Sequence, residues 1–197
     1  MKIAPLALYN ALENDMNPEP FLSNVMALGL QTHGDPRASF GAVSVAATIK
    51  WLLHHDPNHH CLCGLLDHTF HMVDIVESRY RFYRRNDDAL SARLHTAFSA
   101  MFDVPKLETV IGAGCFTLES VPFALATFHR NPIDFRKGVL EAVNAGGDTD
   151  TTAAMVGAMI GAHVGIDGIP PEWVERVDDC GRAIVLANDM CDALKHP

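Results

Sequence analysis

The sequence predicts an all-α domain, because apolar residues recur at helical spacing along nearly the whole chain. No segment alternates apolar and polar residues in the manner of a half-buried strand, and the β-branched residues are scattered inside helical patterns. No repeat of fixed period and no low-complexity segment interrupts these patterns. With 197 residues and a hydrophobic content of 48%, the chain suits one compact multi-helix domain over residues 1–197.

The first half of the chain contains five segments with helical patterns. The second segment places Phe21, Val25 and Leu28 on or near one face. The third is rich in Ala, Val and Ser and should be buried nearly all round, and Asp35-Pro36 suits its start because Asp caps helices and Pro favours their first position. The five expected helices are Ile3–Ala11, Pro20–Leu30, Ala38–Leu53, Leu65–Arg84 and Leu90–Phe102.

The second half continues in the same way. One segment of very small residues includes Gly157 and Gly161, which permit close packing against neighbouring helices and should bury this element centrally. Pro170-Pro171 indicates the start of a new short helix, because proline is favoured in the first helical turn. The expected helices are Ser120–His129, Pro132–Ala145, Asp148–Val164, Glu172–Val177 and Arg182–Leu194.

Charge and cysteine content limit the function classes. The formal net charge of −9 argues against a nucleic-acid backbone or an anionic membrane as the main partner, although a local cation can still attract a phosphate-containing small ligand. No apolar run has the length of a membrane span or of a signal peptide. Five cysteines, an odd count at irregular spacing, argue against a disulfide framework and favour a cytoplasmic location.

The most informative segment is Asn-Ala-Gly-Gly-Asp-Thr-Asp-Thr-Thr, which precedes and opens the small-residue helix. Asp148, Asp150, Thr149 and Thr151 lie within four residues of one another. A helix start needs only one such side chain as its N-cap. Carboxylate and hydroxyl oxygens this close together are typical ligands of a hard divalent cation such as Mg²⁺. The alternative is a helix start with more capping side chains than it needs.

Two further stretches contain candidate ligands. His33 lies beside the expected start of the long buried helix, a place that attracts phosphate, but a histidine in a loop is often an ordinary polar residue. The expected loop His54–Gly64 carries His54, His55, His59, His60, Cys61 and Cys63, and His68 and His71 follow it. These side chains suit Zn²⁺, but their spacing matches no closed structural zinc pattern, so a polar turn with helix-end histidines is the other interpretation.

Several of these segments resemble the ADP-ribosylglycohydrolase family. The resemblance rests on Gly-Gly-Asp-Thr-Asp-Thr-Thr-Ala-Ala, on Thr-His-Gly-Asp-Pro before an Ala-rich helix, and on Gly-Ile-Asp-Gly-Ile-Pro-Pro-Glu-Trp. The stretches beginning at Met1 and at Gly114 also look like family segments, in family order. The resemblance covers nearly the whole chain.

The resemblance implies an all-helical fold with two Mg²⁺ ions at the bottom of an ADP-ribose cleft, and hydrolysis at the ribose carbon that carries a modified side chain or another ADP-ribose. By motif match, Asp148, Asp150 and Thr151 would be metal ligands. His33 would lie near the diphosphate or ribose. The expected loop Asp103–Phe116, with Gly112 and Gly114 allowing close backbone approach, would line the adenosine side through Gly114, Cys115 and Phe116.

The sequence departs from the family pattern in one respect. Complete members carry an earlier Gly-Asp-Ala-x-Gly stretch, an acidic residue near the reaction centre and a Thr-Asp-Asp motif that supplies other metal ligands. None of these occurs here, and Asn86-Asp87-Asp88 lies at the wrong place in family order. We therefore expect an N-terminally truncated relative with at most a partial Mg²⁺ site, whose catalytic residue is not identifiable.

Three hypotheses follow from this departure. The first is a Mg²⁺-dependent hydrolase that removes ADP-ribose from modified protein or a related conjugate. The second is a non-catalytic structural or ADP-ribose-binding relative, comparable to the crystallins of this family. The third is a partner subunit that assembles with a separate N-terminal half, and a homo-oligomer is also open. Because each Mg²⁺ needs about six oxygens, we expect the isolated chain to bind metal weakly and to hydrolyse slowly or not at all.

Overall fold

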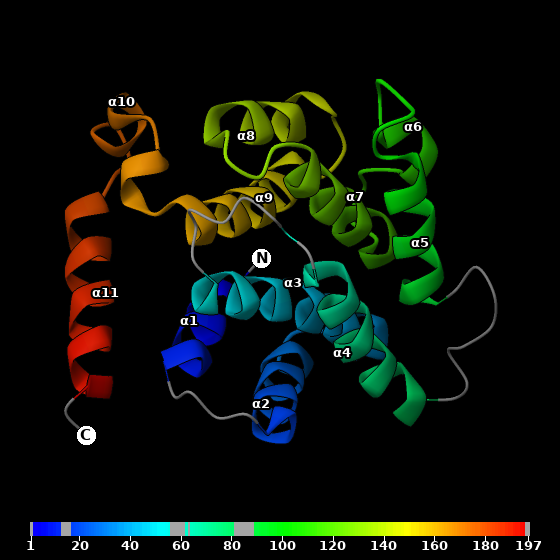
Figure 1. Ribbon diagram of the computed structural model, residues 1–197, viewed down its shortest axis with the longest axis horizontal. Helices are drawn as coiled ribbons and strands as arrows, with labels where there is room; N and C mark the ends of the chain where they lie inside the picture. Colours follow the sequence, from blue (N-terminus) through cyan, green and yellow to red (C-terminus); the bar gives the residue numbers. More distant parts are fainter. Residues whose placement is uncertain (1, 13–16, 56–61, 63, 81–88, 196–197) are drawn as a thin grey trace.

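The computed structural model describes residues 2–12, 17–55, 62, 64–80 and 89–195. Within these ranges every regular element is helical, which confirms the all-α prediction (Figure 1). The elements are α1 (Ala4–Leu12), α2 (Pro18–Leu30), α3 (Pro36–His54), α4 (Leu65–Arg79), α5 (Leu90–Ala100), α6 (Glu108–Ile111), α7 (Thr117–Arg130), α8 (Phe135–Asn144), α9 (Thr149–Val164), the 3₁₀ turn η3 (Ile166–Gly168), α10 (Pro171–Val174) and α11 (Cys180–Lys195). No helix of the described residues is both long and apolar enough to cross a membrane.

Most of the differences from the sequence prediction lie at helix ends. Helix α2 begins two residues early because the Asn17 side chain accepts from the backbone N–H of Glu19 and Pro18 occupies the first turn. Helix α8 begins at Phe135 rather than Pro132, since Asp134 provides its N-cap by accepting from the N–H of Lys137. Helix α4 ends at Arg79, before the expected end at residue 84.

The expected loop Asp103–Phe116 was wrong in one part, because it contains the single helical turn α6. Leu107 and Ile111 of this segment are buried, at 1% and 2% exposure, so core packing holds the turn in place. Gly112 then adopts a positive φ of 86° and directs the chain into the remaining loop.

Helix α3 lies at the centre of the core, where α1, α2, α4, α7 and α9 pack against it. Its buried side chains run along its whole length, from Ser39 and Phe40 to Leu52, as its composition predicted. Helix α9 packs against α3, α7 and α8. A Cβ on Gly138 of α8 would clash with the side chain of Ile160 on α9, so the close approach of these two helices depends on the missing side chain at Gly138. A Cβ on Gly157 of α9 would make only ordinary contact with the ring of Phe135, at 3.6 Å.

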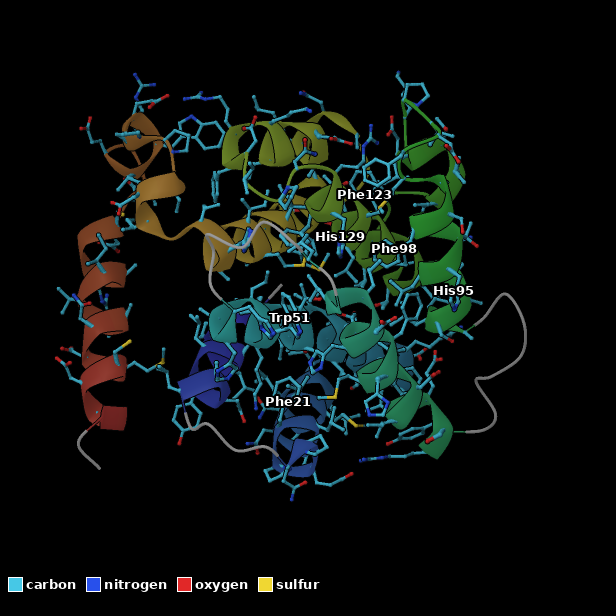
Figure 2. The ribbon with its side chains drawn as sticks, viewed as in Figure 1. Phe21, Trp51, His95, Phe98, Phe123 and His129 are labelled. Atoms are coloured by element: carbon cyan, nitrogen blue, oxygen red, sulfur yellow. The ribbon has the colours of Figure 1, made fainter. Side chains whose placement is uncertain are left out.

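A row of aromatic rings joins α4, α5 and α7 (Figure 2). The ring of His95 stacks on that of Phe70 at 4.3 Å, and the rings of Phe98 and His129 meet edge to face at 5.1 Å. Desolvation lowers the pKa of His129 from 6.5 to about 4, so its imidazole is neutral at physiological pH. This row packs along the edge of the core, with His95 exposed, and lies outside the cavity described below.

Helices α4 and α5 are also joined by a buried carboxylate. Glu77 is 2% exposed, and it accepts from the backbone N–H of Leu90 at 2.7 Å and from the hydroxyl of Ser91 at 2.6 Å. Ala89, at the N-cap position of α5, has no side chain that can cap the helix. Glu77 therefore provides the cap of α5 from a neighbouring helix.

Helix α11, red in Figure 1, lies at the edge of the molecule beside α1. Ile184, Val185 and Leu186 are each at least 43% exposed on it. The expected C-terminal helix is thus present over Cys180–Lys195, but its described side chains contribute little to the core.

Candidate functional site

A cavity of about 480 Å³ opens where the α2–α3 turn meets the starts of α7 and α9. Its size lies in the range of small-molecule sites. Polar groups line it from two parts of the fold, with His33 and Thr32 on the α2–α3 turn and Asp148 and Thr151 at the start of α9. Its lining residues are Lys2, Ile3, Leu28, Gly29, Gln31, Thr32, His33, Ala38, Gly41, Ala42, Val45, Cys115, Thr117, Ser120, Val121, Asp148, Thr151 and Met155.

Asp148 occupies the N-cap position of α9, but its side chain makes no capping hydrogen bond. Its side chain instead lies within hydrogen-bonding reach of that of Asp150, and this contact is the main cause that holds the pKa of Asp150 below its ordinary value. The backbone N–H of Thr151, in the first turn of α9, contributes to the same shift. Asp148 therefore contacts a second acid and does not cap the helix, while Asp150 keeps a contact with the helix start.

The helix start at Asp35 gives a useful contrast. Asp35 caps α3, since its carboxylate accepts from the backbone N–H of Arg37 at 2.9 Å. The Arg37 guanidinium also donates to it at 2.6 Å, and this hydrogen bond is the main reason why the pKa of Asp35 lies below its ordinary value. The carboxylate of Asp35 is thus fully engaged, and the capping predicted for Asp35 is confirmed.

The two glycines before Asp148 form the turn that places the start of α9 against Ala113. Gly146 and Gly147 have φ values of 78° and 71°, which favour glycine. A Cβ on Gly147 would lie 2.7 Å from the carbonyl carbon of Ala113, whereas one on Gly146 would meet open space. This close approach lets the N–H of Asp148 donate to the carbonyl of Ala113 at 2.8 Å. The loop before α7 and the start of α9 are therefore joined beside the cavity.

The three candidate residues of that loop lie in different surroundings. Cys115 is exposed and lines the cavity. Gly114 does not line it, and its N–H donates to the carboxylate of Glu119 at 3.1 Å. Phe116 is 46% exposed, and the Arg37 guanidinium lies 5.2 Å from its ring centroid in a cation–π contact.

The structure thus brings His33, Cys115, Asp148 and Thr151 together around one cavity, while Asp150, Gly114 and Phe116 lie beside it. Five polar lining residues were missed by sequence reasoning, and Thr32, beside His33, is one of them. Lys2 adds an ammonium group, and Gln31, Thr117 and Ser120 add donors and acceptors. Each is a common residue type at an ordinary helical or loop position, so no local signal identifies it.

The residue types at the α9 start are those that a hard cation prefers, because Asp148, Asp150 and Thr151 carry carboxylate and hydroxyl oxygens. Within the described ranges, no group of three or more His, Cys, Asp or Glu side chains is arranged to hold a metal ion. Full coordination therefore requires oxygens besides those of the described acids.

The zinc hypothesis falls largely outside the described residues, because His59, His60, Cys61 and Cys63 are among those not described. Of the remaining candidates, His55 stacks its ring on Trp51 at 3.5 Å and hydrogen-bonds through Nδ1 to the Trp51 carbonyl at 2.6 Å. Figure 2 shows Trp51 on α3. These contacts stabilise the end of α3.

Comparison with known proteins gives a family match over nearly the whole chain. A family model described as ADP-ribosylglycohydrolase matches residues 1–196. An uncharacterised protein of Archaeoglobus fulgidus is 32% identical over 149 residues, which are 75% of this chain and 43% of that protein. Human ADP-ribosylhydrolase ARH3 is 32% identical over 90 residues, or 41% of this chain and 25% of its own length. The ADP-ribosylarginine hydrolase Tri1 of Pseudomonas putida is 39% identical over 62 residues, or 32% and 17%.

The chain spans about half the length, or less, of the curated relatives it matches.

Proposed function

Because the chain belongs to the ADP-ribosylglycohydrolase family, we propose that it forms the ADP-ribose cleft of a hydrolase that removes ADP-ribose from modified protein or a related conjugate. The cavity between the α2–α3 turn and the α9 start is the proposed cleft. The names of its relatives ARH3 and Tri1, both hydrolases of ADP-ribosyl groups, support this reaction class.

The observation that carries the proposal is the state of Asp148. A carboxylate at an N-cap normally accepts a backbone N–H of the first turn, as Asp134 and Asp35 do in this protein. Asp148 makes no such bond, lines the cavity and contacts a second carboxylate. Two adjacent carboxylates repel each other when both are ionised, and a bound cation relieves that repulsion.

We therefore assign Mg²⁺ to Asp148, Asp150 and Thr151, with His33 and Lys2, which line the same cavity, as the groups that contact the diphosphate or ribose. When bound, Mg²⁺ polarises hydroxyl oxygens and orients water. The residues of this chain would bind and orient the ligand: His33 has its Nδ1 2.8 Å from the Thr32 hydroxyl, which holds its ring in place. The exposed thiol of Cys115 would line the adenosine side.

The described residues supply too few acids for two fully coordinated ions. In our proposal the remaining ligands come from residues outside this sequence, either in the same polypeptide or in a separate chain, and the 197 residues alone bind metal weakly and turn over slowly or not at all. The same observation favours a second candidate function, in which the protein binds ADP-ribose without hydrolysing it. A cytoplasmic location, consistent with the five cysteines, is part of the proposal.

Calorimetric titration of ADP-ribose into the purified chain, with and without Mg²⁺, tests the assignment. We expect binding that requires Mg²⁺ and is lost in the double variant Asp148→Asn/Asp150→Asn. Asp134→Asn is the matched control, because Asp134 also stands at a helix start but lies outside the cavity. Binding that is equally strong without Mg²⁺ or in the double variant would refute the metal assignment.

A hydrolysis assay on ADP-ribosylated protein then separates the two functions. Release of ADP-ribose that depends on Asp148 supports the hydrolase. Mg²⁺-dependent binding without release, even after addition of a chain that carries the family's Thr-Asp-Asp segment, supports the binding protein.

A further inference from the structure

Two polar side chains on neighbouring helices hold the loop between α6 and α7. Arg93 of α5 donates from Nε to the carbonyl of Leu118 at 3.0 Å, and from Nη2 to the carbonyl of Ile111. Ile111 ends α6, and Leu118 lies in the first turn of α7. One guanidinium therefore fixes both ends of the loop 112–116, which requires the fork of donors that only arginine has.

The carbonyl of Leu118 is available for this contact because of Pro122. Proline has no N–H, so Pro122 inside α7 leaves the carbonyl four residues earlier without its usual helical donor. Leu118 is 2% exposed, and a buried carbonyl without a donor is costly. Arg93 donates to this carbonyl, so the proline leaves free the acceptor that the arginine uses.

Glu119 fixes the middle of the same loop. Its carboxylate accepts the N–H of Gly114 at 3.1 Å. Side chains at Gly112 and Gly114 would meet this carboxylate, with Cβ atoms 2.6 Å and 2.8 Å from Oε2. The two glycines therefore allow the loop backbone to lie directly on Glu119.

The clamped loop in turn contacts the start of α9. Ala113 lies between the two loop glycines, is 7% exposed and accepts the N–H of Asp148 at 2.8 Å. Cys115 of the same loop lines the cavity. Displacement of the loop would therefore move Asp148 and one wall of the cavity together.

We propose that Arg93 and Glu119 are positioning residues, which hold the loop 112–116 so that Ala113 fixes the place of Asp148 at the cavity. The inference about ligand affinity rests on the proposed function, whereas the inference about position concerns the fold alone. Neither residue lines the cavity, so both act through the loop rather than on the ligand.

The test compares matched variants of the full chain. Glu119→Ala removes the acceptor for Gly114, and Glu119→Gln keeps an oxygen that can accept the same N–H. Arg93→Lys keeps the charge but loses the fork that reaches two carbonyls. Arg130→Lys is the control, because Arg130 is also half-buried but pairs with Glu141 at 2.9 Å, away from the loop.

Two readouts report position without any ligand. The first is hydrogen exchange of the Asp148 amide, compared with the Val156 amide in the middle of α9. The second is the alkylation rate of Cys115, followed by peptide mass spectrometry. We expect Glu119→Ala and Arg93→Lys to raise the exchange rate of the Asp148 amide by about tenfold, the scale of one lost hydrogen bond, with Val156 unchanged. The thiol of Cys115 is already exposed, so its alkylation rate should change through the altered position of the loop. Glu119→Gln and Arg130→Lys should remain near the wild type.

The third readout is the Mg²⁺-dependent affinity for ADP-ribose, which should fall by about tenfold in Glu119→Ala and recover in Glu119→Gln. Unchanged exchange at Asp148 in both loop variants would overturn the proposal, and so would an equal acceleration at Val156, which indicates general destabilisation. An affinity as low in Glu119→Gln as in Glu119→Ala would also overturn it, because charge rather than position would then matter. If the wild type does not bind ADP-ribose, the proposed function fails, and exchange and alkylation still decide the positioning role.

Discussion

The substitution Gly147→Ala should destabilise the protein far more than Gly146→Ala, although the two glycines are neighbours with similar backbone angles. Both have positive φ, at 71° and 78°, so an alanine at either position costs about 1 kcal/mol in backbone strain. Only at Gly147 does the new methyl group meet backbone, since its Cβ would lie 2.7 Å from the carbonyl carbon of Ala113. The backbone carbonyl of Ala113 cannot move aside as a flexible side chain can.

The expected difference can be worked out from these contacts. Relief of the clash must separate Ala113 from the turn, which breaks the hydrogen bond from the N–H of Asp148 at a cost of about 1 kcal/mol. The shift of a packed backbone adds about 1 kcal/mol or more. Gly147→Ala should therefore cost about 3 kcal/mol, against about 1 kcal/mol for Gly146→Ala. For a domain of this length, these losses correspond to decreases in Tm of roughly 6–12 °C and 2–4 °C.

Urea unfolding followed by circular dichroism measures both free energies, and calorimetric scanning gives both Tm values. Mg²⁺-dependent ADP-ribose binding, measured on the folded fraction, should also weaken in Gly147→Ala because the carboxylate of Asp148 is displaced. Equal losses of stability in the two variants would refute the reasoning, since they would show that the close approach to Ala113 adds nothing to the backbone strain.

Two further predictions concern single side chains. Asp148→Ala should change the free energy of unfolding by less than about 0.5 kcal/mol, because its side chain makes no capping bond, whereas Asp134→Ala removes a cap and should cost about 1 kcal/mol. Urea unfolding of both variants checks this, and a large loss in Asp148→Ala would restore the capping interpretation. The second prediction concerns His129, whose pKa falls from 6.5 to about 4 on burial. The unfolded state therefore binds its proton first, and stability should fall by up to about 3 kcal/mol as the pH decreases from 7 to 4. The variant His129→Phe should lose that part of the pH dependence, and a stability profile identical to that of the wild type would contradict it.

The sequence patterns predicted the fold class and the positions of most helices, because helical periodicity and capping are local. Asp35-Pro36 illustrates this, since the cap and the first-turn proline alone determine where α3 begins. The start of α7 could not be predicted in the same way. Pro122 favours a helix that begins near it, yet α7 begins at Thr117, because Arg93 satisfies the carbonyl that the proline leaves without a donor. That contact joins residues 25 positions apart and has no local signature.

In the candidate site, too, the features with a local sequence signal could be predicted and those set by tertiary packing could not. The acids of the α9 start could be identified because their density exceeds what a helix end needs. The missing capping bond of Asp148 could not be predicted, because it depends on how the turn before α9 lies against Ala113. Lys2, Thr117 and Ser120 reach the cavity only through the packing of α1, α7 and α9, and nothing in their neighbouring residues distinguishes them.

The buried carboxylate of Glu77 has a practical consequence for protein engineering. By accepting from Leu90 and Ser91, it joins the end of α4 to the start of α5 and so fixes both ends of the segment between them. The closure entropy of a connecting segment grows slowly with its length, by about 0.6 kcal/mol for each doubling. Neither α4 nor α5 contributes a lining residue to the cavity. An insertion of a tag or reporter between residues 80 and 89 should therefore cost little stability, because Glu77 still joins α4 to α5.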